Sequence, residues 1–201
     1  MIRSFIFDIG NVLLAFDFDR ALNRILPRCE LPITDERKLA CDAIKNEYER
    51  GAIDRGTFLR RIYAEIGYRG TDADFVQAWE EIFTENTPMV DLVRSLHGKL
   101  PIYLLSNTSD LHVDYIFREY PFFSLFGDAV YSYRAGCMKP ERKIYEITVE
   151  QLQVKPEETV FIDDLPKNIE TAKAMGFHAF QYDLKDHTTL LEGLRKLGVE
   201  L

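Results

Sequence analysis

The sequence lacks the features of secreted and membrane-spanning proteins. Its three cysteines, Cys29, Cys41 and Cys137, are odd in number and scattered, so they do not suggest a disulfide framework. No apolar stretch approaches the roughly 20 residues that span a bilayer. The opening MIRSFIFDIG is too short and too soon acidic for a signal peptide. We therefore expect a cytoplasmic protein that has no membrane association.

Positive charge is also scarce. The 201 residues include 25 lysines and arginines against 33 aspartates and glutamates, which gives a formal net charge of −8. There is no run of lysine or arginine, and binding to a nucleic-acid backbone needs a basic surface. Nucleic acid is therefore excluded as a main partner. An anionic ligand would need positive charge supplied locally, by a lysine or by a bound cation.

The chain does contain short apolar runs that alternate with helical patterns. Five runs are too short for helices and rich in aromatic or branched residues: Ser4–Phe7, Ile102–Leu105, Ala129–Tyr133, Thr159–Ile162 and His178–Gln181. The later runs are separated by amphipathic stretches at Ser109–Tyr120, Glu141–Gln151 and Pro166–Met175. Strands that alternate with helices pair in parallel, so the pattern predicts an α/β fold with a parallel sheet.

The segment from about Phe18 to Glu85 has a different pattern. It shows no clear strand and four amphipathic helical stretches: Asp19–Leu26, Asp35–Arg50, Thr57–Ile66 and Ala73–Phe83. Asp54 is a plausible N-cap of the third stretch, and Thr71 with Asp74 resembles a capping box before the fourth. This pattern predicts a block of helices inserted after the first strand.

The residues that could carry chemistry follow the predicted strands. Asp8 ends the first strand, Ser106-Asn107-Thr108 ends the second, and the pair Asp163-Asp164 ends the fourth. Lys139 lies in the loop after the third. Ligands of open parallel sheets bind beyond the carboxyl ends of the strands. Two adjacent carboxylates at the end of a buried strand repel each other, and a bound cation is the simplest remedy.

Four segments, FDIGNVL, LLSNT, KPE and FIDD, resemble in order the motifs of the haloacid dehalogenase-like hydrolases. The resemblance covers almost the whole chain, and the residues of these four segments are especially similar to those of bacterial sugar-phosphate phosphatases such as α-glucose-1-phosphate phosphatases. It is also similar to the amino-terminal phosphatase domain of soluble epoxide hydrolases. The resemblance implies a three-layer Rossmann-like core of residues 1–13 and 88–201, and an inserted all-helical cap of residues 14–87.

The resemblance also implies roles for the residues at the sheet edge. Asp8 would be the nucleophile of a phosphatase that acts on a small phosphorylated metabolite, with a sugar phosphate as the favoured class. Mg²⁺ would be held by Asp8, the backbone carbonyl of Gly10 and Asp164, with Asp163 supporting them from behind. The Mg²⁺ ion would neutralise the negative charge of the substrate phosphate, which otherwise repels the carboxylate nucleophile. Lys139, Ser106 and the amide of Asn107 would bind the phosphoryl group, with Lys139 also serving catalysis.

Position 10 departs from the family pattern, because most of these phosphatases carry a general acid and base there. Three interpretations remain open: a substrate with a good leaving group, another acid such as Asp17, or a slow enzyme. Asp17 is alternatively the N-cap of the first inserted helix. Two rival functions also remain, a metal-independent 2-haloacid dehalogenase and a weakly active protein that binds a phosphorylated ligand. The sequence leaves a monomer and a homodimer equally open.

Smaller details are also open. Asn168 follows Asp164 on the next helix and either braces the acidic loop or lies on the surface. His112 is expected to be structural, because no histidine shows metal-ligand spacing. Cys137 is expected to be a small packing residue.

Overall fold

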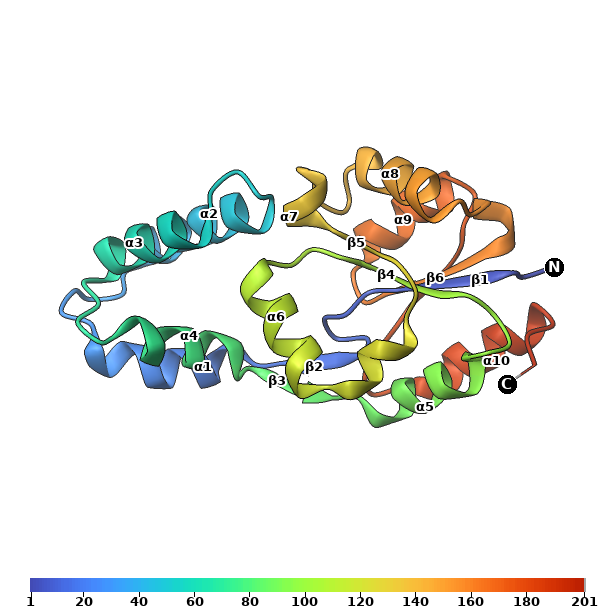
Figure 1. Cartoon of the computed structure of the whole chain (residues 1–201), viewed down its shortest axis with the longest axis horizontal. Helices are drawn as coiled ribbons and strands as arrows, with labels where there is room; N and C mark the ends of the chain where they lie inside the picture. Colours follow the sequence, from blue (N-terminus) through green and yellow to red (C-terminus); the bar gives the residue numbers. More distant parts are fainter. Residues whose placement is uncertain (201) are drawn as a thin grey trace.

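The computed structural model describes residues 1–200 and contains a five-stranded parallel sheet in the order β5-β4-β1-β6-β7 (Figure 1). Its strands are β1 (Ser4–Phe7), β4 (Ile102–Ser106), β5 (Ala129–Tyr131), β6 (Thr159–Asp163) and β7 (His178–Gln181). The central strand β1 pairs with β4 on one side and with β6 on the other. The predicted α/β fold with a parallel sheet is confirmed.

Helices cover both faces of the sheet and make three layers. One face carries α5 (Thr87–Leu96) and α10 (His187–Lys196), and the other carries α8 (Arg142–Leu152) and α9 (Pro166–Ala174) (Figure 1). Successive side chains of a strand point to opposite faces. Phe5 and Phe7 accordingly pack in the cluster that includes α5 and α10, whereas Ile6 packs in the cluster that includes α8 and α9. Burial on both faces explains why these strands are apolar throughout.

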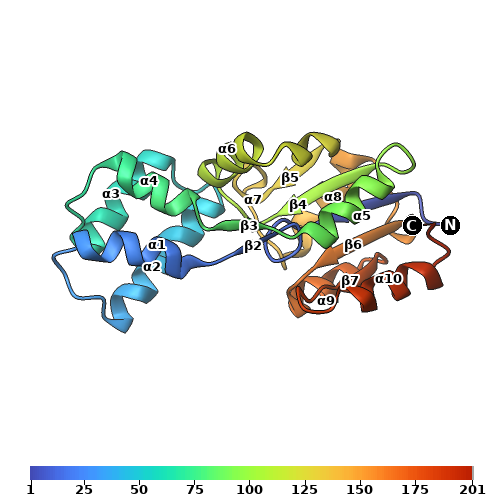
Figure 2. The ribbon, with the colours of Figure 1, turned by 90° about the horizontal axis from the view of Figure 1, so that it is seen from below.

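Four helices, α1 (Phe18–Ile25), α2 (Asp35–Glu49), α3 (Arg55–Ile66) and α4 (Asp72–Glu80), gather at the end of the molecule opposite the termini (Figure 2). They have an apolar cluster of their own, around fully buried Phe58. The expected caps are present, since Asp54 accepts from the amide of Thr57, and Thr71 accepts from the amide of Asp74. We propose residues 14–87 as the cap, and residues 1–13 and 88–201 as the core.

Two details of the predicted secondary structure are wrong. A short strand β3 (Phe83–Glu85) lies where no strand was expected, paired antiparallel with β2 (Leu14–Phe16). The chain leaves the core along β2 and returns to it along β3, so the two segments lie side by side and form hydrogen bonds. Each strand has only three residues, which is too short for an alternating pattern to be recognised in the sequence. The run expected to be a strand to residue 133 turns after Tyr131 into α7 (Ser132–Ala135), because the buried Ser132 side chain bonds the carbonyl oxygens of Glu49 and Thr108.

The remaining elements are α6 (Asp110–Glu119) and three short 3₁₀ helices at Leu26–Arg28, Pro121–Leu125 and Pro156–Glu158. Across residues 1–200, no helix combines the length and the apolarity needed to cross a bilayer.

Candidate active site

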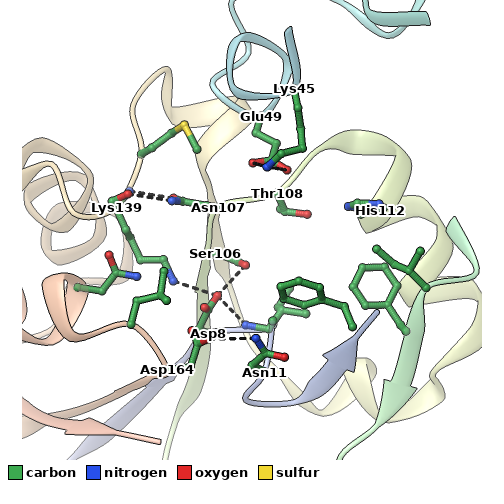
Figure 3. A pocket seen from close by; sticks show the side chains of 18 of the residues that line it. Asp8, Asn11, Lys45, Glu49, Ser106, Asn107, Thr108, His112, Lys139 and Asp164 are labelled. Carbon is green, nitrogen blue, oxygen red and sulfur yellow. Dashed lines mark hydrogen bonds and ion pairs between the residues drawn. The ribbon is translucent and has the colours of Figure 1, made fainter. Parts of the chain in front are cut away.

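The carboxyl ends of β1, β4 and β6 meet at a cavity of about 360 Å³. Its lining includes Asp8, Ser106, Asn107, Lys139 and Asp164, the residues that the sequence placed after the strands (Figure 3). The cavity lies where the helical segment faces the sheet, so α2 supplies part of its wall. Parallel pairing of β1 with both neighbours is what brings together residues more than 90 positions apart.

Asp8 is held by three donors to one of its oxygens. The Oδ1 atom accepts from the Ile9 amide at 2.7 Å and from the Ser106 hydroxyl at 2.7 Å, and it lies 2.9 Å from the Lys139 ammonium. The residue is only 7% exposed. Burial raises the pKa of Asp8 to about 7; Lys139 opposes this rise and the nearby Asp163 adds to it. The site therefore lacks the positive charge needed to keep this carboxylate ionised at low energetic cost.

Lys139 is buried between two carboxylates. Its Nζ atom lies 2.9 Å from Asp8 and 2.6 Å from Asp163, and it also donates to the Leu105 carbonyl at 3.0 Å. Burial acts to lower the pKa of Lys139, but the two facing carboxylates outweigh burial and raise it. Lys139 is therefore a fixed positive charge beside Asp8.

Asn107 holds the Lys139 loop in place rather than directing its side chain at a ligand. Its side-chain oxygen accepts from the Lys139 amide at 2.8 Å, and its side-chain nitrogen donates to the Lys139 carbonyl at 2.9 Å. Two reciprocal bonds across 32 residues fix the loop against β4. Thus the side chain of Asn107 is committed to positioning Lys139.

The two adjacent aspartates have different surroundings. Asp163 is fully buried, and its Oδ1 accepts from the Leu165 amide and the Asn168 side chain while its Oδ2 receives Lys139. Asp164 borders the cavity and accepts from the Asn11 side chain at 3.0 Å. Burial raises the pKa of Asp164. Of the two interpretations of Asn168, the contact with Asp163 supports the one in which it braces the acidic loop.

The three carboxylates fit a divalent cation. One oxygen from each of Asp8, Asp163 and Asp164 lies within 4.8 Å of the others. Oxygen ligands about 2.1 Å from one Mg²⁺ lie at most about 4.2 Å apart, so small side-chain adjustments suffice. When ionised, these groups carry three negative charges against the single positive charge of Lys139. A bound dication would balance that excess and favour the ionised form of Asp8.

The environment of Gly10 is tight on the side that faces Phe16. A Cβ atom built on Gly10 would lie 3.0 Å from the ring of Phe16, another residue that lines the cavity. Of the two interpretations of Asp17, the structure supports the N-cap. It caps α1 through the amide of Asp19 and pairs with Arg20, and its side chain is 55% exposed.

Several cavity residues were not identified from the sequence. Asn11 follows Gly10 and binds Asp164, but one asparagine after a strand carries no distinctive signal. Lys45 and Glu49 of α2 have the spacing of an ordinary helical ion pair. His112 also lines the cavity, and its Nε2 atom bonds the carbonyl oxygen of Trp79. Burial lowers the pKa of His112 to about 4, in keeping with a neutral structural histidine.

The sequence matches a known family over most of its length. The family model described as haloacid dehalogenase-like hydrolase matches residues 2–176. A D-ribitol-5-phosphate phosphatase of Bacteroides thetaiotaomicron is 31% identical over 192 residues, which cover 90% of this chain and 92% of that protein. A sesquiterpene phosphatase of Aspergillus oryzae is 27% identical over 87% of this chain and 86% of its own.

The fold has equally extensive matches among solved structures. A haloacid dehalogenase family enzyme of Bacteroides thetaiotaomicron, in complex with magnesium and inorganic phosphate, superposes with a TM-score of 0.84. The two are 26% identical, and the match covers 95% of this chain and 99% of that one. A haloacid dehalogenase-like hydrolase of Porphyromonas gingivalis matches with a TM-score of 0.83 and 26% identity over the full length of both chains.

Proposed function

The chain belongs to the haloacid dehalogenase-like hydrolase family, and we propose that it is a magnesium-dependent phosphatase of small phosphorylated metabolites, sugar phosphates above all. The observation that carries the proposal is that Asp8, Lys139 and Asp164 line one cavity, with buried Asp163 paired to Lys139 and clustered with the other two carboxylates. The names of two relatives, both phosphatases, and a related structure with magnesium and phosphate support the same reaction class.

In the proposed reaction, a carboxylate oxygen of Asp8 attacks the phosphorus of the substrate. The bond between phosphorus and the leaving oxygen breaks, the leaving oxygen takes up a proton from solvent water, and an aspartyl phosphate forms on Asp8. Water then attacks the phosphorus of this intermediate, which releases inorganic phosphate and regenerates the carboxylate. Lys139 stabilises the charge on the phosphoryl oxygens, and the Ser106 hydroxyl, now on Asp8, turns to donate to one of them.

Asp8, the Gly10 carbonyl and Asp164 are proposed to hold Mg²⁺, which when bound neutralises charge on the phosphoryl group. Asp163 is proposed to orient the site without contacting the ion. This division is supported by contacts, because both oxygens of Asp163 are already hydrogen bonded deep in the core. Asp164 borders the cavity and is bonded there by Asn11.

The proposal is tested by measuring phosphate release from p-nitrophenyl phosphate and from a panel of sugar phosphates, with Mg²⁺ and with EDTA. Turnover should require Mg²⁺ and disappear in Asp8→Asn. The Asp17→Asn variant is the matched control, because it makes the same change at an exposed N-cap and should keep full turnover. Chloride release from a 2-haloacid without metal would instead assign a dehalogenase. Phosphate binding without turnover would assign a phospho-ligand-binding protein.

A further inference from the structure

One wall of the cavity carries charged groups that the proposed phosphoryl chemistry does not use. Lys45, Asn46 and Glu49 come from the last turns of α2 and line the same cavity as Asp8. Figure 3 shows Lys45 and Glu49 across the cavity from Asp8 and Lys139. A substrate whose phosphate lies at Asp8 would therefore extend the rest of its structure toward this pair.

The carboxylate of Glu49 is buried and poorly satisfied. Its side chain is 11% exposed, and its oxygens lie 3.4 Å and 3.5 Å from the Lys45 ammonium. Charge-assisted hydrogen bonds are ordinarily about 2.7–2.9 Å long. Within residues 1–200, no other donor reaches this carboxylate. A carboxylate has about four acceptor sites, so most of the hydrogen-bonding capacity of Glu49 is left for a ligand.

The position of Glu49 over the cavity is fixed by the core. The Ser132 hydroxyl donates to the Glu49 carbonyl at 2.6 Å, and the same hydroxyl accepts from the Thr108 amide at 2.9 Å. Thr108 itself lines the cavity next to Ser106 and Asn107. The end of α2 is thereby tied to the loop after β4, so the backbone that carries the Glu49 side chain is fixed relative to the phosphoryl site.

We infer that Lys45 and Glu49 form a subsite for hydroxyl groups, which makes the protein selective for polyhydroxylated phosphate esters over apolar ones. The inference rests on the proposed phosphatase function. A hydroxyl both donates and accepts, so adjacent hydroxyls of a polyol can bond the carboxylate and the ammonium together. A site built to hydrogen bond hydroxyls rejects an analogue that lacks them, since its buried polar groups are then left unpaired.

The same contacts argue against a substrate with a hydrocarbon chain, which the name of the sesquiterpene phosphatase relative would otherwise suggest. Such a chain would exclude water from Lys45 and Glu49 without replacing its hydrogen bonds, and burying loosely paired charges in this way is costly. Aromatic and aliphatic residues, among them Phe18, Ile82 and Phe83, form another part of the wall. They can pack against the carbon atoms of a polyol while its hydroxyls face α2.

An ordinary helix-stabilising pair is the competing explanation, and a matched pair elsewhere separates the two. Arg142 and Glu146 of α8 have the same spacing and a 2.9 Å contact, but their side chains are 64% and 56% exposed. Glu146→Gln therefore makes the chemical change of Glu49→Gln in an exposed pair that does not line this cavity. A role in helix stability alone would give the two variants similar effects.

The test compares kcat and KM for D-ribitol 5-phosphate with those for n-pentyl phosphate, which has the same carbon chain without hydroxyls. Wild type and Glu146→Gln should prefer the polyol ester. Glu49→Gln should lower kcat/KM for the polyol ester by at least about tenfold, mainly through KM, and change that for pentyl phosphate by no more than about twofold. Lys45→Met should act in the same direction, and circular dichroism melting checks that each variant folds.

The outcomes separate this inference from the proposed function. If wild type with Mg²⁺ releases phosphate from neither ester nor from p-nitrophenyl phosphate, the phosphatase proposal fails. If wild type turns over both esters without preference, or if Glu49→Gln lowers both by the same factor, the phosphatase proposal stands and the hydroxyl subsite is overturned. An equal fall in kcat for p-nitrophenyl phosphate would also overturn it, because that substrate has no sugar hydroxyl.

Discussion

Replacing Asp8 by asparagine is expected to stabilise the metal-free protein while abolishing its activity. Burial raises the pKa of Asp8 from 3.8 to about 7. Because the pKa of Asp8 is higher in the folded state than in the unfolded state, folding favours the protonated carboxyl. The stability that this group contributes is complete below pH 3.8, where it is protonated in both states, and is lost as pH rises through 7. One pKa unit corresponds to about 1.36 kcal/mol, so ionisation of this carboxylate costs the fold up to about 4 kcal/mol above pH 7.

The gain from asparagine is smaller than that limit. Lys139 loses one of the two carboxylates that it contacts and keeps only Asp163. We therefore expect the Asp8→Asn protein to gain roughly 2 kcal/mol in unfolding free energy at about pH 8, and less at about pH 5, where wild-type Asp8 is protonated. This is the expected trade-off between stability and function at an active site.

Urea denaturation with EDTA, between about pH 5 and pH 8, measures the effect. The stability difference between Asp8→Asn and wild type should grow with pH, and Asp17→Asn should follow the wild-type curve. Adding Mg²⁺ at about pH 8 should stabilise wild type more than Asp8→Asn, since the ion binds the ionised carboxylate. An Asp8→Asn protein that is less stable than wild type at about pH 8, or a difference that is independent of pH, would refute the reasoning.

Two further perturbations test the charge balance and the cavity wall. Lys139→Met leaves Asp8 and Asp163 without their cation, so the unfolding free energy at neutral pH should fall by about 3–5 kcal/mol. The rate of phosphate release should fall by roughly 10³-fold or more. Full activity would contradict the role of Lys139. Burial lowers the pKa of His112 from 6.5 to about 4, so wild type should lose up to about 3 kcal/mol as pH falls through this range. Melting at about pH 7 and pH 4.5 should show a smaller loss in His112→Asn, and an equal loss would contradict the assignment.

The core of the fold could be predicted because its local signals agree with its topology. Each of the five predicted strands is present, and β1 and β6 are buried along their whole length. A fully buried parallel strand is short, apolar and bounded by turns, so it is recognisable without an alignment. The parallel sheet then brings the residues that follow these strands together, because the carboxyl ends of parallel strands lie at the same edge. For this reason Asp8, Ser106 and Asp164 could be expected to share a cavity.

Other features depend on contacts that no local pattern encodes. The β2–β3 pair forms only because two distant passages of the chain lie side by side. The side chain of Asn107 bonds the backbone of Lys139, a partner 32 residues away that no local pattern could identify. The crowding of Gly10 by Phe16 likewise arises from the path of the chain into β2. In each case the deciding neighbour is set by tertiary packing.

The same reasoning explains why the reaction class is easier to predict from this sequence than the substrate. The phosphoryl site is built at strand ends, where backbone position follows from the sheet and a carboxylate or lysine stands out against apolar neighbours. The part of the cavity wall that α2 supplies includes Lys45 and Glu49. In the sequence this pair has the same four-residue spacing as an exposed helical pair such as Arg142 and Glu146, so the two cannot be told apart. Only the packing of α2 over the cavity buries the first pair, and burial is what turns an ordinary ion pair into a candidate for recognising hydroxyl groups.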